Sequence, residues 1–168
     1  MAIRQSSYLS DIHLGPEYLA YFWRGHCLNH FSRGEVAISD CIEVLRQFGA
    51  ALDANSQHPG AAARSRALSL ALRSHSYGGH EKVALQRLIE WDELSLERAG
   101  LAHGLFKCTP SGVTITLTEY LSGERRDHPP KFHSLDDMRS YLSRLEACVQ
   151  NLDVQLGQIE AYCRRHVA

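Results

Sequence analysis

The sequence predicts an all-α fold: an up-and-down bundle of about four helices, two or three of them long, with a small β-hairpin before the last helix. Apolar residues recur with helical spacing through most of the 168 residues. Strict alternation of β-branched and apolar residues occurs in only one stretch, 113–120. The segments between the helical patterns are short, which favours antiparallel neighbours. Length and pattern indicate one domain over 1–168, with an irregular N-terminal segment at 1–15.

The first predicted helix begins at Pro16, because proline suits the first helical turn, where no N–H is needed. Its apolar pattern continues to about Leu52. Ser32 and Glu35 would fit a capping box that starts a second helix, but the apolar stripe through Ile38 also includes Glu35 and favours one long helix. A carboxylate on an apolar stripe is costly without a partner. Glu35 is therefore either a residue at the edge of the stripe or the ion-pair partner of an arginine.

A loop composition follows at 53–60, and 61–74 has the pattern of a short helix. The third predicted helix is long and extends over 81–98. We expect it to end near Gly100 or Gly104, because glycine is common where helices stop.

The predicted β-hairpin occupies 113–133. Its first strand is the alternating stretch 113–120, the polar residues 122–127 form the turn, and 131–133 return. An isolated hairpin is marginal in water, so it should lie against the helices or pair with another chain.

The last predicted helix covers 134–165. Ser134 is a good N-cap residue, and the acids Asp136 and Asp137 suit the first turn. Apolar residues then recur at alternating steps of three and four, which forms a seam of heptad character. This seam fits either the core of the bundle or a coiled coil with a partner protein. Its members are Leu135, Met138, Leu142, Leu145, Val149, Leu152, Leu156, Ile159 and Cys163.

Composition narrows the classes of function. Hydrophobic residues make up 44%, charged residues 22%, and the formal net charge is −1, so a general electrostatic attraction to nucleic acid is not indicated, although a local basic cleft is compatible with these values. Five scattered cysteines without a Cys-x-x-Cys pair argue against a zinc ribbon and a disulfide framework. No apolar run reaches the ~20 residues of a membrane helix, and no signal peptide is recognisable. We expect a cytoplasmic protein that does not enter a membrane.

Histidines raise a metal hypothesis, which is the weakest of those considered. His26 and His30 are four residues apart, a spacing that suits two ligands on one helix face. No third ligand of metal spacing lies nearby in the sequence. The prediction is therefore no metal and no cofactor.

The stretch 94–106 closes the third helical pattern and contains Arg98, His103 and Gly104. This arrangement resembles the signature of the HEPN superfamily (higher eukaryotes and prokaryotes nucleotide-binding domains), in which an Arg-x4-His motif, often followed by Gly, lies at the end of a bundle helix. The order of elements over 16–163 is also similar to a group of bacterial HEPN-like proteins. Ala99 differs from the common form of the motif, which has Asn at this position.

The resemblance implies RNA binding or metal-independent RNA cleavage in a stress, toxin–antitoxin or phage-defence system. His103 would act as general acid and base, and Arg98 would bind phosphate oxygens. Gly104 would support the motif, and Glu35 or Glu97 would replace the missing Asn. The resemblance also implies a homodimer in which the motif helices meet. The alternative is a non-enzymatic helical interaction module with a degenerate motif, in which the two side chains only stabilise a helix C-terminus.

Helix geometry limits the catalytic hypothesis. Five residues of an unbroken α-helix turn the chain by ~500°, so Arg98 and His103 would point ~140° apart. They converge only if the helix unwinds near 100–104 or if two protomers contribute to one site.

Overall fold

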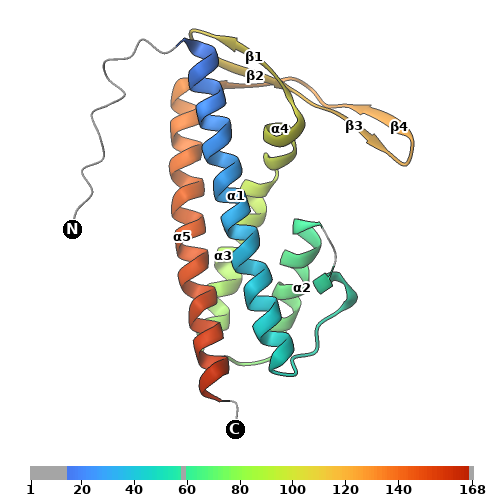
Figure 1. The fold of residues 1–168 in the computed structure, drawn as a ribbon, viewed down its shortest axis with the longest axis vertical. Helices are drawn as coiled ribbons and strands as arrows, with labels where there is room; N and C mark the ends of the chain where they lie inside the picture. Colours follow the sequence, from blue (N-terminus) through green and yellow to red (C-terminus); the bar gives the residue numbers. More distant parts are fainter. Residues whose placement is uncertain (1–14, 58–59, 167–168) are drawn as a thin grey trace, which may run out of the picture.

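The computed structural model describes residues 15–57 and 60–166, so nearly all of the predicted irregular segment 1–15 lies outside the described residues. Helices form an elongated body, and the strands lie across one of its ends (Figure 1). The helices are α1 (Pro16–Gln47), η2 (Ala54–Gln57, a 3₁₀ turn), α2 (Ala61–Ser74), α3 (His80–Ser95), α4 (Arg98–His103) and α5 (Leu135–Arg165). The strands are β1 (Leu105–Thr109), β2 (Gly112–Thr116), β3 (Thr118–Leu121), β4 (Glu124–Asp127) and β5 (Lys131–Ser134).

The two longest helices, α1 and α5, pack along each other and run in the same direction from the sheet end of the molecule (Figure 1). Helix α3 runs back between them and α2, and it contacts both α5 and α2. The predicted up-and-down bundle of about four helices is therefore wrong. Strands at one end return the chain from α4 to the start of α5, which places α5 parallel to α1.

Helix α1 is continuous from Pro16, as its apolar stripe predicts, and Ser32 starts no second helix, but the helix ends at Gln47 and not near Leu52. Its close contact with α3 depends on Gly34. A Cβ at this position would lie 2.4 Å from the ring of Trp91, which is itself fully buried. The absent side chain thus leaves room for the Trp91 ring of α3 to pack against the backbone of α1.

Helix α5 begins where the sequence predicts it. The Ser134 hydroxyl accepts a hydrogen bond from the Asp137 N–H (3.1 Å), and the Asp137 carboxylate accepts one from the Ser134 N–H (3.0 Å). This reciprocal pair is a capping box. The apolar seam of α5 belongs to the core of the chain. Of the two interpretations of this seam, a core or a coiled coil with a partner, the structure supports the core. Its buried members are Met138, Leu145, Val149, Leu152, Leu156, Ile159 and Cys163.

The all-α prediction is also wrong, because the fold mixes helices with two antiparallel sheets. The larger sheet has the strand order β1-β2-β5. Strand β2 pairs with β5 as the predicted hairpin requires, and β1, which follows the motif helix directly, pairs with the other edge of β2. The turn between β1 and β2 ends at Gly112, whose φ of 153° and close approach to the His133 carbonyl exclude a side chain.

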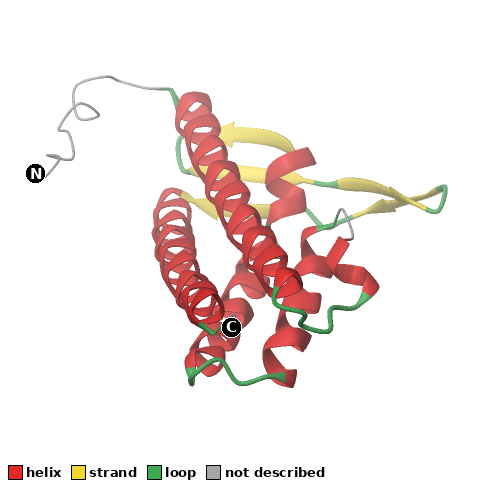
Figure 2. Ribbon diagram, turned by 60° about the horizontal axis from the view of Figure 1, so that its bottom comes forward, coloured by secondary structure: helices red, strands yellow, loops and turns green. Residues whose placement is uncertain are grey.

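The predicted strand 113–120 is two strands, since β2 ends at Thr116 and β3 begins at Thr118. Strands β3 and β4 form a separate two-stranded sheet around the turn at Ser122 and Gly123. This arm extends away from the helices in both views (Figures 1 and 2). The single hairpin predicted over 113–133 therefore divides its residues between two sheets. None of the described helices combines the length and the apolar character needed to cross a membrane.

Candidate functional site

The motif residues lie on the short helix α4. Helix α3 ends at Ser95, a turn at Leu96 and Glu97 follows, and α4 then extends from Arg98 to His103. The prediction of one helix over 81–98 missed this break, which comes before Arg98 rather than near 100–104. Arg98 and His103 therefore share one continuous helix, on which their side chains point ~140° apart. Among the described residues, no hydrogen bond or ion pair joins them.

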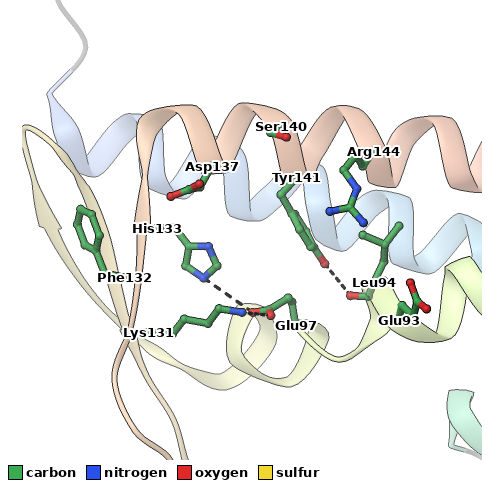
Figure 3. A pocket seen from close by; sticks show the side chains of 10 residues that line it. All are labelled: Glu93, Leu94, Glu97, Lys131, Phe132, His133, Asp137, Ser140, Tyr141 and Arg144. Atoms are coloured by element: carbon green, nitrogen blue, oxygen red, sulfur yellow. Dashed lines mark hydrogen bonds and ion pairs between the residues drawn. The ribbon is translucent and has the colours of Figure 1, made fainter.

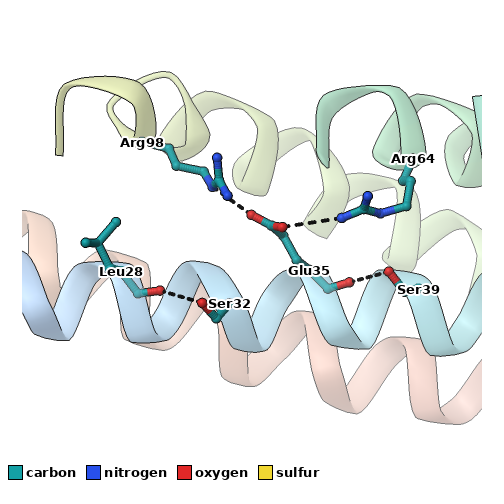
Figure 4. A network of polar contacts seen from close by, with 6 residues as sticks. All are labelled: Leu28, Ser32, Glu35, Ser39, Arg64 and Arg98. Carbon is teal, nitrogen blue, oxygen red and sulfur yellow. Dashed lines mark hydrogen bonds and ion pairs between the residues drawn. The ribbon is translucent and has the colours of Figure 1, made fainter. Parts of the chain in front are cut away.

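Arg98 forms an ion pair with Glu35 of α1, so the partner that the apolar stripe suggested for this carboxylate is present. The Arg98 Nε lies 2.7 Å from Glu35 Oε1, and Arg64 Nη2 of α2 lies 3.3 Å from Oε2 of the same carboxylate (Figure 4). The Arg98 contact has ion-pair distance, but its N–H is not aligned for a hydrogen bond. One acid from α1 thus holds arginines from two other helices.

This cluster of Glu35, Arg64 and Arg98, here called the arginine cluster, carries one more positive charge than negative. The side chain of Arg98 is 42% exposed, whereas those of Glu35 and Arg64 are largely covered. Arg98 meets Glu35 through Nε, and part of its guanidinium group is directed away from the carboxylate (Figure 4). A guanidinium that is oriented on one edge and exposed on another can bind an oxyanion such as phosphate.

His103 is exposed at the last position of α4. The carbonyl oxygen of its neighbour Ala102 accepts a hydrogen bond from Arg24 Nη2 of α1 (2.6 Å). The Arg24 guanidinium also lies over the ring of Phe106, 5.0 Å from its centre. Arg24 therefore fixes the C-terminal end of α4, where His103 is located.

Gly104 has a steric role. Its φ of −69° is accessible to any residue, but a Cβ would lie 2.4 Å from the Gly100 carbonyl oxygen and 2.5 Å from Ile115 Cγ2 of β2. The Gly104 N–H donates to that same carbonyl (2.8 Å). Glycine at this position lets the end of α4 pack directly on the sheet.

Glu97 lies on the other side of the α3–α4 turn, away from the arginine cluster. It forms an ion pair with Lys131 of β5, and its Oε2 is 3.8 Å from Nε2 of His133 (Figure 3). These residues line a pocket of about 430 Å³ between α3, β5 and α5. The His133 side chain is only 8% exposed, and this burial lowers its pKa although the Glu97 charge acts in the opposite direction. Glu97 therefore does not support Arg98 directly.

His26 and His30, the pair considered as metal ligands, differ in their environments. The His26 ring packs against Phe22 at 4.3 Å between centres. His30 is buried, which lowers its pKa. Within the part of the chain that the structure describes, no group of three His, Cys, Asp or Glu side chains is placed to hold a metal ion.

Of the predicted site residues, the structure brings Arg98 and Glu35 together and leaves His103 and Glu97 elsewhere. The sequence reasoning missed Arg64 and Arg24. Arg64 lies one helical turn before the buried Leu68 of α2, a position from which a side chain can face the core. Comparison with known proteins finds no matching family model, no matching curated protein and no matching solved structure.

Proposed function

We propose that the chain is a HEPN-like protein that binds RNA at the surface formed by α4 and the arginine cluster. The observation that carries this proposal is the geometry of Arg98. A partly exposed guanidinium, oriented by Glu35 and accompanied by Arg64, lies at the start of the helix that ends in His103. Such a group suits a phosphate oxygen, because guanidinium and phosphate can form paired charge-assisted hydrogen bonds.

Cleavage needs more than binding. A base must take the proton of a ribose 2′-OH, and a cation must stabilise the charge that develops on the phosphate. His103 and Arg98 are suitable groups, but they diverge on one helix. We therefore propose that cleavage takes place in a homodimer, in which His103 of one protomer and Arg98 of its partner face the same phosphate.

An apolar groove beside the arginine cluster supports such an assembly. It has a volume of about 550 Å³ and lies between α2 and α3, close to the start of α4. Its exposed apolar side chains are Leu70, Ile89 and Leu96, of which Leu96 is 81% exposed in the α3–α4 turn. Contiguous exposed apolar surface of this kind is typical of protein interfaces. A second copy seated here would bring two α4 helices close together.

The test combines RNA cleavage and RNA binding in the presence of a chelator. Wild-type protein should bind single-stranded RNA, and Arg98→Ala should weaken binding about tenfold or more, because a charge-assisted contact is lost. The salt dependence of binding should also fall by about one unit of slope. Arg165→Ala, which removes an exposed arginine at the C-terminal end of α5, outside the arginine cluster and the apolar groove, is the matched control and should have a smaller effect. Equal effects of the two substitutions would contradict the proposal.

A separate variant tests the cleavage step. His103→Ala should abolish RNA cleavage and retain most of the binding, because the histidine acts on a proton and not as the main phosphate ligand. Leu96→Asp should convert the dimer to a monomer, as measured by light scattering, and should abolish cleavage together with assembly.

The second candidate is a non-enzymatic interaction module. The observation that favours it is the exposed groove around Leu96, which needs no RNA to explain it. Under this alternative the wild-type protein neither binds nor cleaves RNA, and Leu96→Asp changes only the assembly.

A further inference from the structure

The N-terminal part of α1 carries an unusual amount of exposed aromatic surface. Tyr18, Tyr21 and Phe22 are all exposed, with 54% of Tyr21 accessible. The rings of Tyr18 and Phe22 are stacked with 6.4 Å between centres, and Tyr21 stacks on Phe106 of β1 at 6.3 Å with an angle of 11° between the planes. We call Tyr18, Tyr21, Phe22 and Phe106 the aromatic shelf. Large aromatic side chains gathered on a surface usually mark a binding site.

A chain of contacts joins the shelf to α4. Tyr21 stacks on Phe106, and Phe106 lies under the guanidinium of Arg24. Arg24 in turn binds the carbonyl of Ala102, next to His103. The shelf therefore adjoins the C-terminal end of α4, and Arg98 lies at the other end of this helix, ~7.5 Å along its axis.

Within the shelf, Tyr21 lies on the same side of α1 as the arginine cluster, whereas Tyr18 and Phe22 lie ~100° and ~140° around the helix from Glu35. Tyr21 and Glu35 are fourteen residues apart, which corresponds to nearly four complete helical turns and an offset of ~40°. The distance between them along the helix is ~21 Å. At the ~3.4 Å per nucleotide of a stacked strand, this length accommodates about six nucleotides. The arginine cluster at one end and the Tyr21 ring at the other therefore form a strip with the length of a short single strand.

We propose that the aromatic shelf stacks bases of single-stranded RNA whose phosphates contact the arginine cluster, an inference that rests on the RNA binding proposed above. Aromatic faces beside arginines are the combination that binds single strands, because every base offers a ring face and every nucleotide a phosphate. Duplex RNA keeps its base faces covered, so the shelf selects unpaired RNA. Since the net charge of the chain is −1, stacking supplies affinity that general charge attraction does not.

The experiment measures fluorescence anisotropy of a labelled oligouridine with the full-length protein. Tyr21→Ala should weaken binding roughly 5- to 160-fold, the range found when one stacking side chain is removed. Tyr21→Phe keeps the ring and should bind like wild type. Tyr120→Ala, which removes an exposed tyrosine from the β3–β4 arm, is the control for non-specific loss of aromatic surface. An abasic oligonucleotide of the same length should bind more weakly and should respond to Arg98→Ala but not to Tyr21→Ala.

The outcomes separate this inference from the proposed function. If Arg98→Ala weakens binding and Tyr21→Ala does not, the shelf is not a base platform, whereas the RNA-binding proposal stands. If wild-type protein binds no oligonucleotide, both are wrong. If Tyr21→Ala alters the molar mass in light scattering and leaves RNA affinity unchanged, the shelf is a protein interface and the inference is overturned. Circular dichroism of each variant confirms folding, which an exposed position such as Tyr21 should not disturb.

Discussion

Glu97 and Arg98 are neighbours in the chain but belong to different surfaces. Glu97 faces β5 and α5, where Lys131 neutralises it at the edge of a mixed polar pocket. Arg98 faces α1 and α2, where Glu35 orients it and Arg64 adds a second cation. The turn that separates α3 from α4 directs consecutive side chains to opposite sides. Proximity in a motif therefore says little about which residues share a site.

The two surfaces also differ in charge. On the Glu97 side, three acids and two bases line the pocket, and the buried His133, whose pKa is lowered by burial, lies among them. On the Arg98 side, one acid serves two arginines and leaves a positive excess near an exposed histidine. Only the second arrangement favours an anionic ligand. Three experiments test how the two surfaces are built.

The largest expected effect comes from the contact between the end of α4 and strand β2, which holds α4 in place. Gly104→Ala would force a methyl group into the Gly100 carbonyl and Ile115, and overpacking of this kind costs about 1–3 kcal/mol of unfolding free energy. Gly100→Ala is the matched control, because its Cβ would meet only Ile115 at an ordinary 3.6 Å. Alanine there should even stabilise α4 slightly. Urea denaturation of both variants measures the difference, and equal stability would mean that α4 is not held against the sheet.

An intermediate effect should separate the two carboxylates. Glu35→Gln leaves two arginines without their shared acid and should cost about 1–2 kcal/mol, the lower part of the range for a covered group that loses its partner, because Arg98 is partly exposed to water. Glu97→Gln removes the partner of the exposed Lys131 and should cost less than about 1 kcal/mol. Chemical denaturation in low salt provides the measurement. A larger loss for Glu97→Gln would reverse the assignment of the organising acid.

The smallest expected effect is a pH dependence of the free energy of unfolding, caused by His133 beside Glu97. Burial lowers the pKa of His133 below its ordinary value of 6.5, so below that pH the unfolded chain binds a proton that the folded chain does not. Stability should be complete above about pH 6.5 and should fall as the pH drops towards the folded pKa, by at most ~1.4 kcal/mol per pH unit from this group. His133→Gln should flatten the slope of unfolding free energy between about pH 7.5 and 5.5. An unchanged slope would show that the pKa of the His133 imidazole is the same in the folded and the unfolded chain.

Helical periodicity was sufficient to predict α1, α2 and α5. Long apolar stripes reflect local geometry, and the caps at Pro16 and Ser134 mark their starts in the sequence. The direction of α5 relative to α1 was not predictable in this way. It depends on how many strands the chain forms after α4, and strand pairing is non-local.

Strand β1 was missed because five residues, Leu-Phe-Lys-Cys-Thr, carry too little alternation to stand out after a helix. The turn composition at 109–112, Thr-Pro-Ser-Gly, was the available signal for a hairpin with β2. The break at Leu117 has no such signal, since alternation continues through it. In the site, Glu35 was predictable because an acid on an apolar stripe needs a partner. That Arg64 is one of its partners depends on the packing of α2 on α1 and was not predictable from the sequence.

The β3–β4 arm, which stands away from the helices (Figure 1), should be the first part of the described fold to open. Two strands without a third, or without a helix against them, have little to gain from staying paired. Backbone amides of 118–127 should therefore exchange with deuterium much faster than those of β2, although only Leu117 separates the two regions. A protease that cuts within this arm should leave the helical body intact.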